Sequence, residues 1–188
     1  MRTKILDLRP TQFSLGYIDV DDKVAKINAI HDPDRGKKVP VVVGPKGQLY
    51  IIDNHHFIRA MWECNYTHVH VNVVADYSRL SVKKFWAKMK KMKYVFLQDQ
   101  FGDRRKVEDL PKTIRTMPDN PYRSLAFIVR EGGSFDKSTV PFAEFYWAEL
   151  FRARIKKLDP ISVEGIAAAL KVCRSKAAKK LPGYKDKV

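Results

Sequence analysis

Two adjacent histidines and an arginine lie within the run Asp53-Asn54-His55-His56-Phe57-Ile58-Arg59-Ala60. The run follows an apolar stretch at 49–52 and has the pattern of a helix start, with Asp53 or Asn54 as the N-cap. The first turn of a helix has unpaired backbone N–H groups and a partial positive charge, so it favours anions. Arginine donates two parallel hydrogen bonds to a phosphate, and histidine can transfer a proton near neutral pH. We therefore predict an anion site at His55, His56 and Arg59.

The same residues also fit an ordinary capped helix. In that interpretation the two histidines make hydrogen bonds within the protein, and Arg59 pairs with Glu63, four residues further along the helix. The two interpretations differ in whether an open cleft lies above the helix start.

Further candidate groups lie at two other predicted helix starts. Arg123 and Ser124 follow the pair Asn120-Pro121, so both lie in a first helical turn, where an anion binds; a plain capped helix is the alternative. Glu144 lies among apolar and aromatic residues, so it either pairs with a base such as Arg123 or has a raised pKa. Either state makes Glu144 a candidate general base, and a structural ion pair is the alternative.

A basic stripe suits contacts with nucleic-acid phosphates. The helix predicted after Ser81 has lysines on its polar faces, and a second basic cluster follows it along the chain. The residues of this stripe are Lys83, Lys84, Lys88, Lys90, Lys91, Arg104 and Arg105. A solvated lysine face is the alternative.

Composition gives the same indication of acidic partners. The 188 residues include 36 basic and 21 acidic side chains, for a net charge of +15, which favours nucleic acid or nucleotide phosphates as partners.

Cys64 and Cys173 are far apart and have no metal-type spacing, which suits a reducing compartment. No apolar run approaches the ~20 residues that span a bilayer, so we expect a cytoplasmic protein without a membrane partner.

The order of the predicted elements indicates an α+β fold with a helical extension. We expect strands at 5–8, 39–43, 48–52 and 69–73, and helices at 20–30, 53–65, 120–133, 142–157 and 162–180, besides the lysine-rich one after Ser81. A loop is expected at 31–36 and a loose basic tail after 183. We predict a phosphate-binding domain at 1–80, a basic and aromatic helical subdomain at 81–158, and a C-terminal helix with its tail at 159–188.

Several short motifs lie in the order found in one known superfamily. The run Leu8-Arg9-Pro10-Thr11-Gln12 is similar to its opening turn, and Asp53-x-His55-His56-x-x-Arg59-Ala60 is similar to variants of its phosphate-binding motif. Later runs at 120–125, 141–148 and 181–184 are similar to one branch of it. On these motifs the chain resembles the ParB/sulfiredoxin superfamily, and specifically its ParB-like nuclease branch, over nearly its whole length.

The resemblance implies a small mixed sheet with helices and a nucleoside triphosphate bound where the second helix begins. If a triphosphate is the substrate, we expect Mg²⁺ to accompany it, with Asp53 as one of the ligands of the ion. The residues that we predict to contact the phosphates are Arg9, Thr11, Asp53, Asn54, Arg59, Arg123 and Ser124. Two departures from the pattern are Asn54 where glycine is common and Phe57 where an arginine is common. Neither a reactive cysteine near the site nor a helix-turn-helix after residue 80 is evident, which disfavours cysteine repair and site-specific DNA binding.

We therefore predict a protein that binds nucleotide or nucleic-acid phosphate. As an enzyme it would be a nuclease or nucleotide hydrolase, in which Arg59 and Arg123 hold charge and His55 or His56 moves a proton. Two alternatives stay open: a nucleotide-dependent small-molecule kinase similar to the free-serine kinases, and a non-enzymatic nucleic-acid-binding protein.

Overall fold

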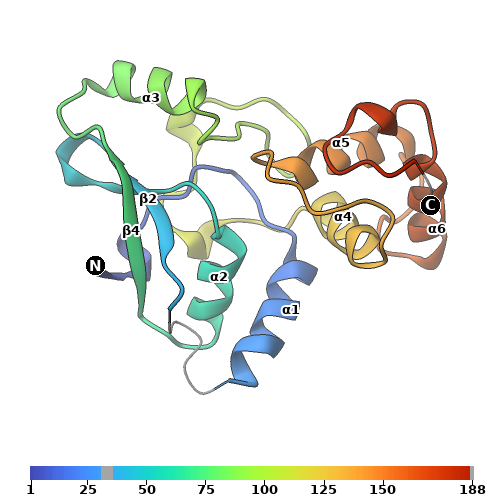
Figure 1. The fold of residues 1–188 in the computed structure, drawn as a ribbon, viewed down its shortest axis with the longest axis horizontal. Helices are drawn as coiled ribbons and strands as arrows, with labels where there is room; N and C mark the ends of the chain where they lie inside the picture. The colour runs from blue at the N-terminus through green and yellow to red at the C-terminus, as the bar shows by residue number, and fades with distance from the viewer. Residues whose placement is uncertain (31–35, 187–188) are drawn as a thin grey trace.

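One four-stranded sheet and two groups of helices make up the described residues, 1–30 and 36–186, of the computed structural model (Figure 1). Most of the loop expected at 31–36 lies outside the described residues. The sheet order is β1 (Arg2–Lys4), β4 (His68–Asp76), β2 (Val39–Val43) and β3 (Leu49–Ile51). The β2–β4 pair is parallel and the other two pairs are antiparallel. The structure therefore confirms the α+β class and the β2–β3 hairpin.

The first strand lies earlier than predicted. Residues Ile5–Asp7 form a 3-10 turn, in which the Leu8 N–H donates to the carbonyl oxygen of Ile5 at 3.2 Å. The side chains of Ile5 and Leu8 are both fully buried. Their spacing of three is that of a helical turn, whereas a strand with one buried face alternates with a period of two.

Helix α2 (His55–Glu63) packs on one face of the sheet and α1 (Tyr17–Asn28) packs against α2, and together they enclose the larger core (Figure 1). Helix α1 begins three residues before its predicted start, and α2 begins close to where the sequence indicates. Ile58 and Met61 of α2 are fully buried with Val20 of α1 and the inward-facing valines of β2 and β4. Residues Ile114–Thr116 contribute to the same core through Ile114, which fixes this segment beneath α2.

The opposite face of the sheet is covered by α3 (Val82–Lys91), whose N-cap Ser81 accepts a hydrogen bond from the Lys84 N–H as predicted. Phe85 and Met89 of α3 pack on Val42 of β2. Helix α3 therefore shares a core with the sheet, and the boundary proposed at residue 81 does not separate two cores. Strand β4 continues three residues beyond its predicted end, to Asp76, and the side chain of Val73 within it is 44% exposed.

A second core lies within the helical part of the chain. It is built from α4 (Pro121–Glu131), α5 (Ala143–Arg154) and α6 (Val163–Cys173), with Trp147 at its centre stacked on Phe135 at 4.1 Å. The prediction of one helix through residue 180 is wrong, since α6 ends at Cys173. The tail is also not loose up to residue 184, because the Asp136 N–H donates to Gly183 O and Tyr184 pairs with Phe135.

The two parts meet where α1 contacts α4. Leu15 and Asn120 hydrogen-bond through their backbones at 2.7 Å, so the chain preceding α1 is joined to the start of α4. In Figure 1 the start of α2 faces this junction from the sheet side and α4 and α5 face it from the other side. Among the described helices, none combines the length and the apolar character that crossing a membrane requires.

Candidate functional site

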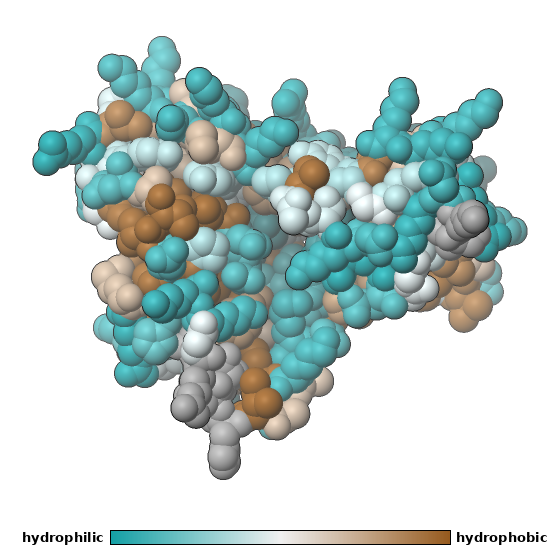
Figure 2. Space-filling model, viewed as in Figure 1, coloured by the Kyte–Doolittle hydropathy of each residue, from teal (hydrophilic) through white to brown (hydrophobic). Residues whose placement is uncertain are grey.

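A cavity of about 630 Å³ opens between the start of α2 and the helical part of the chain. Figure 2 shows hydrophilic side chains around the recess between the two halves of the molecule. The charged and polar residues that line the cavity are Gln12, Asp19, Lys23, Asp53, Asn54, His55, His56, Lys93, Arg123, Arg130, Asp136, Lys137, Ser138, Thr139 and Glu144. We call this cavity the cleft; its size is typical of sites for small molecules and cofactors.

The start of α2 presents backbone N–H groups to the cleft. The first intrahelical bond runs from Ile58 N to Asn54 O, and among the described residues no acceptor serves the amides of 55–57. The side chain of Asn54 makes no capping bond, and its φ of 66° lies in the left-handed region, which asparagine tolerates. The unpaired amides and the helix dipole make this end of α2 suited to an anion.

The two histidines are buried and hold the neighbouring loop in place. The Thr11 N–H donates to Nε2 of His55 at 3.1 Å, and the Gly16 N–H donates to Nε2 of His56 at 3.0 Å. Each Nε2 is therefore an acceptor, and the single proton of each neutral ring is on Nδ1. Burial lowers the pKa of His55 to about 3, and burial together with Arg123 lowers that of His56 well below its usual value.

These contacts correct the predicted role of the histidines. A general acid or base near neutral pH needs an accessible nitrogen and a pKa near the working pH. Neither condition holds at Nε2 of His55 or His56, because backbone amides occupy both atoms and the rings remain neutral. The histidines line the cleft, as predicted, but they act as positioning residues for the loop at 11–16.

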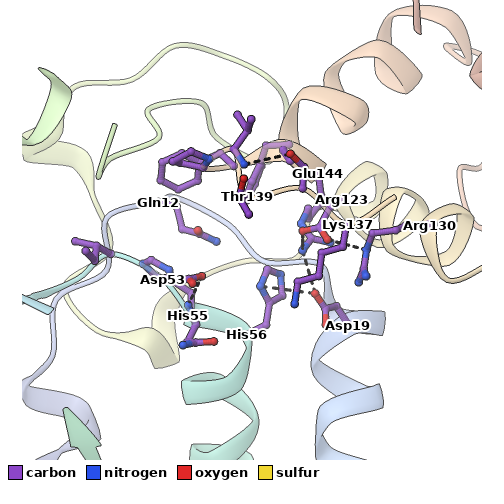
Figure 3. A pocket seen from close by; sticks show the side chains of 18 of the residues that line it. Gln12, Asp19, Asp53, His55, His56, Arg123, Arg130, Lys137, Thr139 and Glu144 are labelled. Atoms are coloured by element: carbon purple, nitrogen blue, oxygen red, sulfur yellow. Dashed lines mark hydrogen bonds and ion pairs between the residues drawn. The ribbon is translucent and has the colours of Figure 1, made fainter. Parts of the chain in front are cut away.

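Arg123 joins three helices and still has unpaired donors. Its Nη2 lies 3.0 Å from Oδ2 of Asp19 on α1 and 2.6 Å from Oε2 of Glu144 on α5 (Figure 3). Its side chain is only 3% exposed, yet its Nε and Nη1 have no hydrogen-bond partner among the described residues. Because buried N–H groups are nearly always paired, these two donors are available to a bound molecule such as a ligand or an ordered water.

Asp19 and Glu144 hold the arginines of the cleft. Burial alone raises the pKa of Asp19, but the neighbouring His56 ring, Arg123 and Lys23 together outweigh burial and lower it well below its usual value. Glu144 also contacts Nε of Arg130 at 2.8 Å, so the predicted pairing of Glu144 with a base is confirmed. With two arginines on its carboxylate, Glu144 is placed as a structural ion-pair partner rather than as a general base.

Arg59 lies outside the cleft, contrary to the prediction that it holds charge at the anion site together with Arg123. Its Nε donates to Glu63 at 2.6 Å, and its Nη1 donates to the carbonyl oxygens of Ile114 and Met117 at 3.3 and 3.2 Å. The guanidinium also stacks on Trp62, 5.4 Å from the ring centroid. These contacts tie α2 to the segment beneath it and leave the phosphate role predicted for Arg59 without support.

Three other predicted phosphate contacts also lie outside the cleft. Thr11 donates its hydroxyl to Ile51 O at 2.6 Å, and Arg9 donates to Lys112 O at 2.6 Å. Ser124 Oγ accepts from the Ile18 N–H at 3.3 Å. Of the predicted phosphate-binding residues, the cleft is lined by Asp53, Asn54 and Arg123.

Sequence reasoning missed several residues of the cleft. Gln12, Asp19 and Lys23 precede the histidine motif, and Lys137 belongs to the segment before α5. Gln12 belongs to the opening motif at 8–12, so the motif could have indicated its place in the cleft. Lys137 lies outside every motif, and its place in the cleft follows only from the packing of the helical part against the sheet.

The basic stripe lies on the surface, and none of its residues lines the cleft. Lys83, Lys84, Lys90 and Lys91 of α3 are exposed, and Lys88 is half-buried. Arg104 and Arg105 are exposed in the segment that follows, and Arg105 lies 3.7 Å from Asp99.

The metal prediction rests on Asp53 alone. Its carboxylate is exposed at the start of α2 and accepts a hydrogen bond from the Asn54 N–H at 2.7 Å. The described residues contain no cluster of three histidine, cysteine or acidic side chains placed to hold a metal ion. A single carboxylate fits Mg²⁺ that arrives with phosphate oxygens as its other ligands, and does not fit a protein-built metal centre.

Comparisons with known proteins identify relatives of the whole fold. A family model described as "Putative ParB-like nuclease" matches residues 1–153. The crystal structure of protein Atu1540 from Agrobacterium tumefaciens is similar to this chain with a TM-score of 0.90 and 36% sequence identity, over 98% of this chain and 97% of that one. No curated protein gives a significant match.

Proposed function

We propose, for a chain that belongs to the ParB-like nuclease family, that the cleft binds the phosphate groups of a nucleotide or of a nucleic-acid strand. One observation carries the proposal: the unpaired amides of α2 and the unpaired Nε and Nη1 of Arg123 line the same cavity. A buried donor without an acceptor costs about 1–3 kcal/mol, so an anion that pairs with these groups gains free energy on binding.

The side chains around the cleft also favour negative charge. Five cationic side chains line it, namely Lys23, Lys93, Arg123, Arg130 and Lys137. The carboxylates of Asp19 and Glu144 are already paired with arginines, and Asp136 is paired with Lys185 at 2.8 Å. Exposed Lys93 and Lys137 remain to attract phosphates, because no salt bridge joins them to another described residue.

Phosphoester hydrolysis, the reaction implied by the family description, would take place at this cleft. Asp53 is the carboxylate there that forms no salt bridge with a described residue, so it is the one to hold Mg²⁺ beside bound phosphates. Mg²⁺ supplies charge stabilisation at the phosphoryl group. Asp53, and not the neutral histidines, is accordingly the residue on which hydrolysis would depend.

The proposal is tested by thermal shift with nucleoside triphosphates and tripolyphosphate, each with and without Mg²⁺. A ligand that binds the native state raises the melting temperature. We expect stabilisation of the wild type, a smaller effect in Lys137→Met, and an unchanged effect in the control Lys106→Met, which removes an exposed charge outside the cleft. The proposal fails if no phosphate compound stabilises the wild type, or if both variants respond like it.

A second function is favoured by the surface of α3. Lys83, Lys84, Lys90 and Lys91 are exposed, and none of them forms a salt bridge with a described residue. Lysines free of partners on one helix neutralise backbone phosphates without reading sequence. We propose that this helix contacts a nucleic-acid backbone independently of the cleft.

A further inference from the structure

We infer that the cleft binds a nucleotide with its base stacked on Phe142. The inference rests on the proposed function and deepens it, because it names the ligand as a nucleoside phosphate with an accessible base. The observations that carry it concern the aromatic side chains of the cleft, which the phosphate proposal does not use.

Phe142 has an unfavourable backbone conformation at the wall of the cleft. It is the N-cap of α5, and its φ of 60° lies in the left-handed region, which is rare for a bulky side chain. Its ring is half-buried, and the residue lines the cleft. Strain of this kind costs of order 1–3 kcal/mol and is concentrated at functional sites, so the position of Phe142 calls for a functional explanation.

The ring of Phe142 has support on its protein side. Phe96 lies 5.4 Å away between ring centroids and Phe145 lies 6.2 Å away, and both are buried. Tyr94 is half-buried and also lines the cleft. An aromatic ring backed by other rings and open on one side is the kind of platform on which bases stack.

The aromatic platform lies close along the chain to the residues of the proposed phosphate site. Glu144, which holds Arg123, follows Phe142 by two residues at the start of α5. Gln12 lies between the histidines and the 139–144 segment in Figure 3. Its Nε2 donates to Ser14 O at 2.8 Å, which leaves its carbonyl oxygen as an acceptor for an amino or hydroxyl group of a nucleoside.

The ligand is a nucleotide with an unpaired base rather than duplex DNA or RNA. In a duplex each base face is covered by its neighbours, so Phe142 would have nothing to stack on. The cleft of about 630 Å³ lies in the size range of sites for small molecules. Free nucleotides and the ends of single strands share this chemistry, and binding assays with both distinguish the source.

The test compares nucleotides with a base-free anion by titration calorimetry. We expect at least one nucleoside triphosphate to bind about 5- to 150-fold more tightly than tripolyphosphate, the range that base stacking contributes. Phe142→Gly relieves the left-handed backbone and removes the ring, so its nucleotide affinity should fall to that for tripolyphosphate, which should not change. If the glycine variant does not fold, Phe142→Leu and Phe142→Tyr provide the test instead. Only the tyrosine variant, which keeps an aromatic ring, should bind nucleotide with the wild-type affinity.

The outcomes separate the two proposals. If tripolyphosphate and nucleotides both fail to bind, the proposed function is wrong. If both bind with equal affinity, or if Phe142→Leu binds nucleotide as well as the wild type, the phosphate site stands and the stacking inference is overturned. Preference for a short single strand over the free nucleotide identifies a strand end as the source, and preference for duplex over both contradicts the inference.

Discussion

Nη2 of Arg123 lies 2.6 Å from Oε2 of Glu144 and 3.0 Å from Oδ2 of Asp19, so one buried guanidinium joins α1, α4 and α5. The two walls of the cleft are therefore held together by the same side chain whose Nε and Nη1 are unpaired. This arrangement links the stability of the junction to the proposed ligand site.

Arg123→Met is expected to lower the free energy of unfolding by about 3 kcal/mol, because it removes the buried partner that Asp19 and Glu144 share and leaves them only Lys23 and Arg130. Urea denaturation measures the change. Adding Asp19→Asn and Glu144→Gln to Arg123→Met should recover part of the loss, since the two buried carboxylates that lost Arg123 are then replaced by neutral amides. A triple variant no more stable than Arg123→Met would contradict this account.

Stability should fall as the pH drops below neutrality. Burial lowers the pKa of His55 to about 3 and lowers that of His56 well below its usual value, whereas both reach about 6.5 in the unfolded chain. Between these values the unfolded state binds more protons than the native state. Each histidine therefore lowers the free energy of unfolding by up to about 1.4 kcal/mol per pH unit as the pH falls from about 6.5.

Urea midpoints measured from about pH 8 down to pH 4.5 test this slope. Asp19 does not interfere in this window, because its pKa is lowered from 3.8 and it contributes only at more acidic pH. His55→Gln should flatten the slope by about one proton. Midpoints that do not change with pH would show that the imidazoles are accessible to protons in the native state.

Arg59→Met is expected to affect stability and not ligand binding. The change removes hydrogen bonds to the buried carbonyl oxygens of Ile114 and Met117, which should cost about 1–3 kcal/mol. Affinity for tripolyphosphate, measured by calorimetry, should stay at the wild-type value. A large loss of affinity for tripolyphosphate with unchanged stability would show that Arg59 takes part in binding phosphate.

Lys84→Gln with Lys91→Gln should weaken nucleic-acid binding uniformly across sequences. Each phosphate contact removed is expected to reduce the slope of log K against log salt by about one. Fluorescence anisotropy at several salt concentrations gives the slope. The control pair Lys156→Gln and Lys157→Gln removes the same charge from exposed positions beyond α5 and should leave the slope near the wild-type value. Equal losses in both pairs would indicate a general charge effect instead.

Capping and helix-start patterns predicted the parts of the site that are formed by residues close together in the sequence. The start of α2 and the Asn120-Pro121 start of α4 both depend on neighbouring residues. The sequence left two alternatives open for Arg59, a contact with a bound anion or an ion pair with Glu63. The structure shows the ion pair. What decided between the alternatives was Ile114–Thr116, about 55 residues away, which covers Arg59.

The remaining residues of the cleft depend on long-range packing. Asp19 stands in an acidic stretch of α1 and looks like a solvated helix residue until α4 brings Arg123 beside it. The neutral state of His55 and His56 likewise follows from the loop at 11–16, whose amides occupy both Nε2 atoms. Neither relationship leaves a periodic or motif-level signal.

The central claim is that phosphate binds at the amides of α2 and at Arg123, and NMR titration with tripolyphosphate tests it most directly. In spectra of the ¹⁵N-labelled protein, the backbone amides of His55, His56 and Phe57 and the Nε–H of Arg123 should show the largest shifts, saturating together. Shifts confined to exposed lysines such as those of α3, with these four signals unmoved, would contradict the claim.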